Sequence, residues 1–208
     1  PRRHPWETAR FWFFSRALSP VLAGVDTVRV LDVGAGDAWL GQRLCERWPL
    51  SMNLVGLDPN YLEAQLGERG RVRLVRELPQ GERFQGLLML DVLEHVDDDL
   101  ALLRTYVDHL DPESWVLVSV PGWPSLYTSH DQALHHVRRY TRRALRKCLQ
   151  QAGLNILCSG GLFPSLLPLR WAAKVKENML GAAPFTGAAW TGGPWITGLL
   201  HGFLIVDA

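Results

Sequence analysis

The sequence predicts an α/β fold in which a doubly wound, mostly parallel sheet has helices on both faces. This prediction depends first on two apolar segments that are expected to be strands. The segment 28–33 is followed by the turn Gly34-Ala35-Gly36, and the segment 52–57 is followed by Asp58. A strand entering a Gly-x-Gly turn, followed by a second strand with an acidic end, is typical of a sheet that binds a ligand at the carboxyl ends of its strands. The third observation is the alternation of strand and helix patterns, which indicates right-handed crossovers.

The expected elements follow from apolar periodicity and turn residues. Helices are expected at 6–18, 37–48, 60–69 and 142–152, and another begins at Asp97-Asp98-Asp99. Strands are expected at 28–33, 52–57, 71–75, 86–91, 115–120 and 154–159. Residues 178–206 contain no Asp, Glu, Lys or Arg, and their six glycines and two prolines disfavour a stable helix. We interpret this stretch as a loose segment leading into a last strand at 202–206.

Length and composition indicate one globular domain over residues 1–208. The chain is 47% apolar and 21% charged, and its net charge of +1 does not suggest a nucleic-acid partner. The basic run at 138–147 is interpreted as a solvated helix face. Cys45, Cys148 and Cys158 have no metal-binding or redox spacing, and no signal peptide is recognised, so a cytoplasmic location is expected.

The Gly-x-Gly turn favours a cationic cofactor over a dinucleotide. Its glycines let the backbone approach a ligand, and Asp58 is placed to accept hydrogen bonds from ribose hydroxyls. Asp37 puts an anion where a pyrophosphate would bind, and Trp39 fills the third glycine position. Asp32 adds another carboxylate. These residues favour S-adenosylmethionine, which carries a sulfonium and no phosphate, over NAD or a nucleotide sugar.

Three segments resemble the class I S-adenosylmethionine-dependent methyltransferases. LDVGAGDA is similar to the first motif of that family, VGLDPN to the second, and LLMLDVLEHVDD to the fourth-strand motif. His4, Trp6 and Arg10, then S-V-P, His130-Asp131 and HVRRYT, resemble a bacterial subgroup of methyltransferase types 11, 12 and 23. The resemblance covers about residues 1–175. It implies a Rossmann-like sheet of seven strands with an antiparallel last strand, and methyl transfer to a small-molecule or lipid- or sugar-linked acceptor.

The strand ends and the resemblance together predict the site residues. Cofactor binding is expected at Asp32, Gly34, Ala35, Gly36, Asp58, Pro59, Asn60, Leu90 and Asp91. In this set, Asp32 is expected near the ammonium group of the cofactor, and Pro59 and Asn60 at the edge of the adenine. In the loop 121–140, His130, His136 and Tyr140 are candidates for contacting substrate or acting as a base. The alternative is that these three side chains only pin the loop.

No metal ion is expected, although Asp91, Glu94 and His95 form a D-x-x-E-H pattern. Ubiquinone O-methyltransferases and small-RNA 3′-end methyltransferases carry E-x-x-E-H metal ligands at what looks like this place. The favoured interpretation is a polar helix start with a hydrogen-bonded histidine.

The two ends of the chain are expected to cover the site. The aromatic helix 6–18 and the apolar segment 178–208 would border the acceptor pocket above the cofactor-binding half at 28–95. Such a cover suits an apolar acceptor and a transient contact with a membrane surface. The structural alternatives are plain core packing and a dimer interface, and the oligomeric state stays open. The functional alternatives are a non-catalytic S-adenosylmethionine-binding module and a nucleotide-cofactor enzyme of another class.

Overall fold

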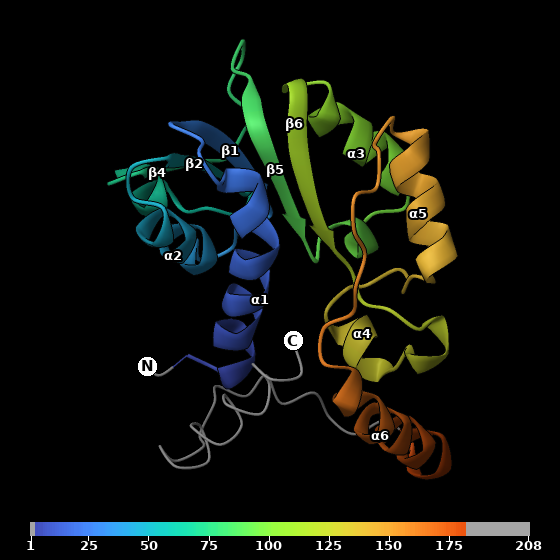
Figure 1. The fold of residues 1–208 in the computed structure, drawn as a ribbon. Helices are drawn as coiled ribbons and strands as arrows, with labels where there is room; N and C mark the ends of the chain where they lie inside the picture. The colour runs from blue at the N-terminus through green and yellow to red at the C-terminus, as the bar shows by residue number, and fades with distance from the viewer. Residues whose placement is uncertain (1–2, 182–208) are drawn as a thin grey trace.

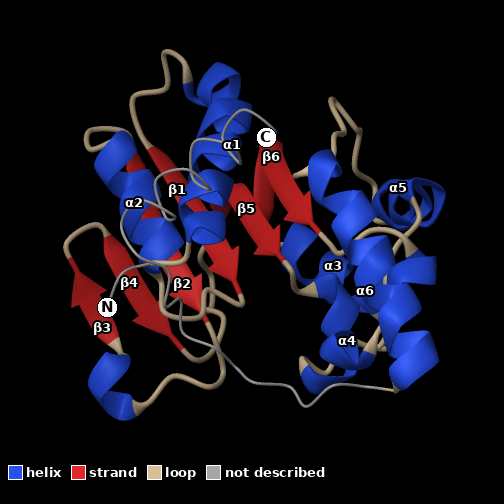
Figure 2. Cartoon of the chain, turned by 90° about the horizontal axis from the view of Figure 1, so that it is seen from below, coloured by secondary structure: helices blue, strands red, loops and turns tan. Residues whose placement is uncertain are grey.

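A six-stranded, mostly parallel sheet forms the centre of the computed structural model, which describes residues 3–181 (Figure 1). The strand order is β3-β4-β2-β1-β5-β6. The strands are β1 (Val28–Val33), β2 (Met52–Leu57), β3 (Gly67–Arg69), β4 (Val72–Val75), β5 (Phe84–Leu90) and β6 (Leu110–Ser119). Only β3 runs antiparallel to its neighbour, and it lies at one edge of the sheet with β6 at the other (Figure 2).

Helices cover both faces of this sheet. The helices are α1 (Pro5–Leu22), α2 (Trp39–Arg47), α3 (Asp99–Val107), α4 (Ser129–Ala133), α5 (Arg142–Gln151) and α6 (Leu167–Leu180). Single turns of 3₁₀ helix lie at η1 (Glu63–Gln65), η2 (Leu93–His95), η3 (Pro124–Leu126) and η4 (Pro164–Leu166). Alternate residues of each strand face opposite sides, so Val30 packs in one core with α1 and α2, while Leu31 packs in another with α3 and α5. The predicted fold class is confirmed, with six strands in residues 3–181 where the resemblance implied seven.

Polar side chains begin three of these helices. His4 accepts from the backbone N–H of Trp6 and starts α1, with Glu7 completing a capping box. Asp98 starts α3 by accepting from Ala101 at 2.9 Å, and Thr141 starts α5 in the same way. Gly153, at a φ of 84°, follows the end of α5 as predicted.

Two predicted elements are wrong. Residues 60–69 were expected to be helical, but they form only η1 and then the edge strand β3, because Gly67 takes a φ of 101° that no helix contains. Residues 154–159 are irregular, since they pair with none of the described strands and a strand needs a hydrogen-bonded neighbour. The predicted strand at 202–206 lies outside the described residues.

The amino-terminal helix is longer than predicted, ending at Leu22 instead of Leu18. It packs on α2 and buries Phe11 and Phe14 in the core, whereas Trp12 is 47% exposed. Among residues 3–181, no helix combines the length and hydropathy that crossing a membrane requires.

Candidate cofactor and acceptor site

The turn after β1 forms an open cradle. Gly34 and Gly36 take φ values of 69° and 56°, in the left-handed region that favours glycine. The N–H of Gly34 donates to the carbonyl of Leu57 at 2.8 Å, and that of Gly36 donates to Asp58 Oδ2 at 3.2 Å. A Cβ on Gly36 would meet nothing within 4 Å. The backbone is therefore bare toward open space, as a closely approaching cofactor requires.

Asp58 is held between this turn and the residues after β2. Its Oδ1 atom accepts from the backbone N–H and the side-chain amide of Asn60, at 2.9 and 3.1 Å. Its Oδ2 atom accepts only the Gly36 N–H among the described residues. Since a carboxylate offers about four acceptor positions, one remains for a ribose hydroxyl. Pro59 is exposed beside it.

Asp32 lies beneath the cradle and not on its open side. The carboxylate is 4% exposed, and a Cβ on Gly41 of α2 would come within 3.4 Å of its Oδ2 atom. Burial raises the pKa of Asp32 to about 7. Burial and then the charge of Asp32 raise the pKa of Tyr61, whose buried hydroxyl has no hydrogen-bond partner among the described residues. Asp32 can affect a cationic cofactor through its charge, from below.

Asp91, directly after half-buried Leu90, is committed to protein partners. It takes a φ of 58°, and its Oδ2 atom is 2.8 Å from Nη2 of Arg10, which α1 supplies. Ser119, at the end of β6, donates to Oδ1 at 3.0 Å. The sequence contains no local signal for this pairing, because Arg10 and Asp91 come from distant parts of the chain.

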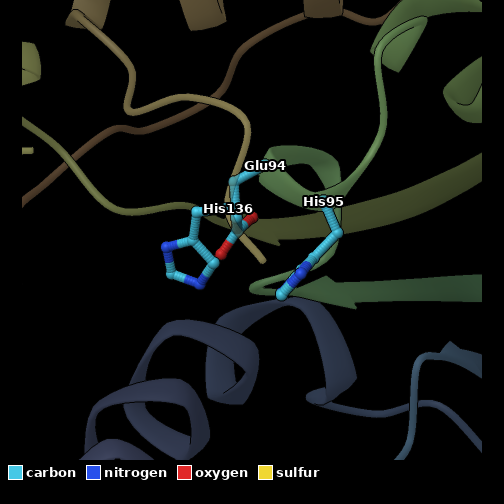
Figure 3. Close-up of side chains that lie close together, drawn as sticks. All are labelled: Glu94, His95 and His136. Atoms are coloured by element: carbon cyan, nitrogen blue, oxygen red, sulfur yellow. The ribbon is translucent and has the colours of Figure 1, made fainter. Parts of the chain in front are cut away.

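Glu94 and His95 of η2 meet His136 of the loop 121–140 (Figure 3). Each side chain offers one ligand atom, and the three atoms lie within 4.8 Å of one another. The two imidazole rings pack edge to face with their centroids 4.7 Å apart, and the Glu94 carboxylate lies close beside them. The backbone N–H of Val137 donates to the Glu94 carbonyl at 2.8 Å and joins the loop to η2.

The Glu94 side chain is fully buried, and neither carboxylate oxygen has a hydrogen-bond partner in the described part of the chain. Burial, followed by the nearby charge of Asp91, raises the pKa of Glu94 to about 8. Burial and then His136 lower the pKa of His95. Two chemistries suit this group: protonated Glu94 beside the two imidazole rings, or one oxygen and two nitrogen ligands around a divalent cation.

A buried aspartate fixes the orientation of His136. Asp131 is fully buried, and its Oδ1 atom is 3.1 Å from His136 Nδ1 and 2.8 Å from Arg139 Nε. Burial opposes its charge, yet the hydrogen bonds from Arg139 and Thr128 outweigh that effect and hold the pKa of Asp131 below its usual range. A charged Asp131 favours a proton on Nδ1 of His136, which leaves Nε2 as an acceptor. The His130-Asp131 pair in the sequence gives no local signal that Asp131 contacts His136, five residues further on.

The other two catalytic candidates differ from His136. The Tyr140 hydroxyl is buried within hydrogen-bond distance of the Asp99 carboxylate, at 2.6 Å, and of the Leu93 carbonyl, at 3.2 Å. These contacts join the end of the loop to η2 and α3. His130 lies on α4, where burial and then Arg170 lower its pKa, and it is not part of the three-residue cluster.

The methyltransferase domain family matches residues 7–159. The ubiquinone biosynthesis O-methyltransferase of Dinoroseobacter shibae is 26% identical over 174 residues, which are 72% of this chain and 69% of that protein. The protein of the same name from Azorhizobium caulinodans is 32% identical over 116 residues, which are 50% of this chain and 43% of that protein. The chain thus spans less than half of the second relative.

A solved structure agrees with the family match. Magnesium protoporphyrin IX methyltransferase from Synechocystis, with bound S-adenosylhomocysteine, has a TM-score of 0.56 to this chain at 17% identity. The similarity covers 74% of this chain and 76% of that one, and at this identity it shows the fold alone. The family match covers most of the chain, and the residues of the cradle fit the cofactor. The chain therefore belongs to the class I methyltransferase domain family, and it is an enzyme that uses S-adenosylmethionine.

Proposed function

We propose that the enzyme transfers the methyl group of S-adenosylmethionine to a hydroxyl oxygen of a small or lipid- or sugar-linked acceptor, with His136 as the base. The observation that carries this proposal is the contact between buried, charged Asp131 and His136 Nδ1 at 3.1 Å. A hydroxyl must lose its proton during the reaction, whereas many other nucleophiles arrive unprotonated. The O-methyltransferase names of the two relatives support an oxygen acceptor.

The proposed cofactor position follows the strand ends. Gly34, Ala35 and Gly36 would hold the methionine part, with Asp32 beneath it. The free acceptor position of Asp58 would receive the ribose, and Pro59 and Asn60 would border the adenine. Leu90 and Asp91 would form the opposite wall. The register pairs Val33 with both Leu57 and Met89, and therefore brings these segments to one edge of the sheet.

Bound S-adenosylmethionine supplies the methyl group and its leaving group. The chain has to align the acceptor oxygen with the methyl carbon, take up the acceptor proton and exclude water. His136 would take the proton at Nε2 while Asp131 stabilises the resulting imidazolium, as an orienting carboxylate does in other histidine bases. Protonated Glu94 would donate a hydrogen bond into the same space.

The first experiment is calorimetry with S-adenosylmethionine, S-adenosylhomocysteine and NAD, in which only the first two are expected to bind. The second follows S-adenosylhomocysteine formation with a panel of phenols, catechols and polyprenylated hydroxy compounds. His136→Asn should lower kcat by about 10²–10⁴-fold, and Asp131→Asn should also lower it, with little effect on cofactor binding by either.

His135→Asn is the matched control, because His135 is exposed next to His136 and Asn tolerates its φ of 58°. Wild-type kcat in His136→Asn would overturn the assignment of the base. Methylation confined to amine or thiol acceptors would overturn the choice of oxygen.

A further inference from the structure

Arg10 of α1 binds at the ends of two strands. Its Nη2 atom lies 2.8 Å from Asp91 Oδ2 and 3.5 Å from Ser119 Oγ, and Ser119 donates to the other oxygen of Asp91. The Arg10 side chain is 20% exposed, so water screens this ion pair less than it screens one on an open surface. Asp91 is therefore an anchor that joins α1 to the ends of β5 and β6.

This anchor stands beside the cofactor cradle. β1 and β5 are neighbours, with Val33 opposite Met89, so the turn at Gly34 follows β1 where Asp91 follows β5. A Cβ on Gly34 would come within 2.9 Å of the Val92 side chain, which shows how closely the two turns approach. The Arg10–Asp91 pair thus places one positive and one negative charge at the wall of the cradle.

Further contacts of α1 fix the place of Arg10. Trp6, one turn before Arg10 on the same face, packs on Phe163 with ring centroids 4.3 Å apart. Arg3 pairs with Asp37 and lies over the Trp39 ring. The helix therefore spans from the start of α2 to η4. These contacts explain the three residues of the H-x-W-x-x-x-R pattern. His4 caps the start of the helix, Trp6 packs on Phe163, and Arg10 forms an ion pair with Asp91 at the wall of the cradle.

We propose that Arg10 is a positioning residue that ties α1 to the cofactor site, and that its pairing with Asp91 keeps the wall of the cradle electrically neutral, so that this wall favours neither S-adenosylmethionine nor S-adenosylhomocysteine. The proposal rests on the cofactor position given above. The two molecules differ by one methyl group and by the positive charge on sulfur. In the intact pair the two charges nearly cancel at the sulfur. Removing one partner leaves a unit charge that acts on the sulfonium and hardly on the neutral thioether.

The test is calorimetry of both molecules with the full chain, read as the ratio of the Kd of S-adenosylmethionine to that of S-adenosylhomocysteine. Arg10→Gln leaves Asp91 unpaired and should lower this ratio about three- to tenfold. Asp91→Asn leaves Arg10 unpaired and should raise it by a similar factor. The double variant Arg10→Gln/Asp91→Asn carries neither charge, and its ratio should return to the wild-type value. Arg10→Lys keeps the charge and should also keep the ratio.

Arg16→Gln is the matched control, because Arg16 is exposed on the same helix and forms no ion pair with the described residues. If Arg10 had a purely structural role, its loss would weaken the binding of both molecules equally. An unchanged Kd ratio in the two single variants would therefore overturn the proposal. A shift in the same direction in both variants would also overturn it. If the ratio is unchanged but Asp58→Ala weakens binding, only this inference fails. If Asp58→Ala also binds normally, the proposed cofactor position fails with it.

Discussion

The carboxylates of three aspartates around the cradle differ in burial and in their partners. Asp58 is half-buried and keeps an open acceptor position, Asp32 is buried beneath the turn, and Asp91 is paired with Arg10. Their place in the motifs predicts that all three lie near the cofactor. It does not predict their burial or pairing, because these depend on α1 and α2, which other parts of the sequence supply.

Asp58→Ala should raise the Kd of S-adenosylhomocysteine by about tenfold or more, because a hydrogen bond to a charged group contributes about 1.5–3 kcal/mol. Thermal unfolding should change little, since the carboxylate is not in the core. Asp26→Ala removes an exposed aspartate before β1 and serves as the control. An unchanged Kd in Asp58→Ala would show that the ribose binds elsewhere.

Asp32→Asn should make the cofactor-free protein more stable than the wild type at pH 8. The folded-state pKa of Asp32 is raised to about 7 from 3.8, so its contribution to stability is lost as pH rises through that window. Asn does not titrate, and the stability difference between variant and wild type should grow by about 2–4 kcal/mol from pH 4 to 8. Urea unfolding at several pH values measures this, and a difference that stays constant with pH contradicts the burial of a titrating group.

At the scale of elements, several local signals correctly predicted the conformation of their own stretch of chain. The Gly-x-Gly turn, the cap of α3 at Asp98 and the end of α5 before Gly153 are of this kind. Residues 154–159 were predicted incorrectly, because a strand depends on a neighbour that local composition does not reveal.

Gly36→Ala should lower the free energy of unfolding by about 1 kcal/mol, because its φ of 56° is strained for any residue with a Cβ. The same variant should lose more free energy of cofactor binding than of folding, since the new methyl group points into the open cradle. Gly24→Ala is a close match, with a φ of 75° and nothing within 4 Å, but it lies at the end of α1 away from the cradle. Equal effects of the two variants on cofactor binding would show that Gly36 does not face the cofactor.

At the scale of the whole molecule, the Glu94–His95–His136 cluster forms only when the loop 121–140 folds back on η2. The D-x-x-E-H pattern revealed Glu94 and His95, but it suggested Asp91 as their companion. The structure brings His136 to that place and turns Asp91 toward Arg10. Spacing along the chain could not distinguish these arrangements, because His136 lies 42 residues after Glu94.

Methyl transfer should survive exhaustive chelation, because the Asp131–His136 pair supplies a base without an ion. The measurement is turnover after treatment with EDTA and gel filtration, with and without added Mg²⁺, Mn²⁺ or Zn²⁺. A different result would assign a cation to Glu94, His95 and His136. In that case chelation would abolish turnover of the wild type, one of these ions would restore it, and the ion would not restore turnover in Glu94→Gln.

The expected cover over the site would involve both ends of the chain, and the structure describes α1 at the first of these ends. α1 buries Phe11 and Phe14 but leaves Trp12 47% exposed, so its packing is complete on one side only. If α1 and segment 178–208 close over the acceptor, S-adenosylhomocysteine should slow hydrogen exchange in both, because closure protects their backbone amides. Peptides from β5 serve as the internal control, since this central strand is protected in either state. Full protection of both segments without ligand, unchanged on adding it, would mean that they are permanent core or interface and that the acceptor enters another way.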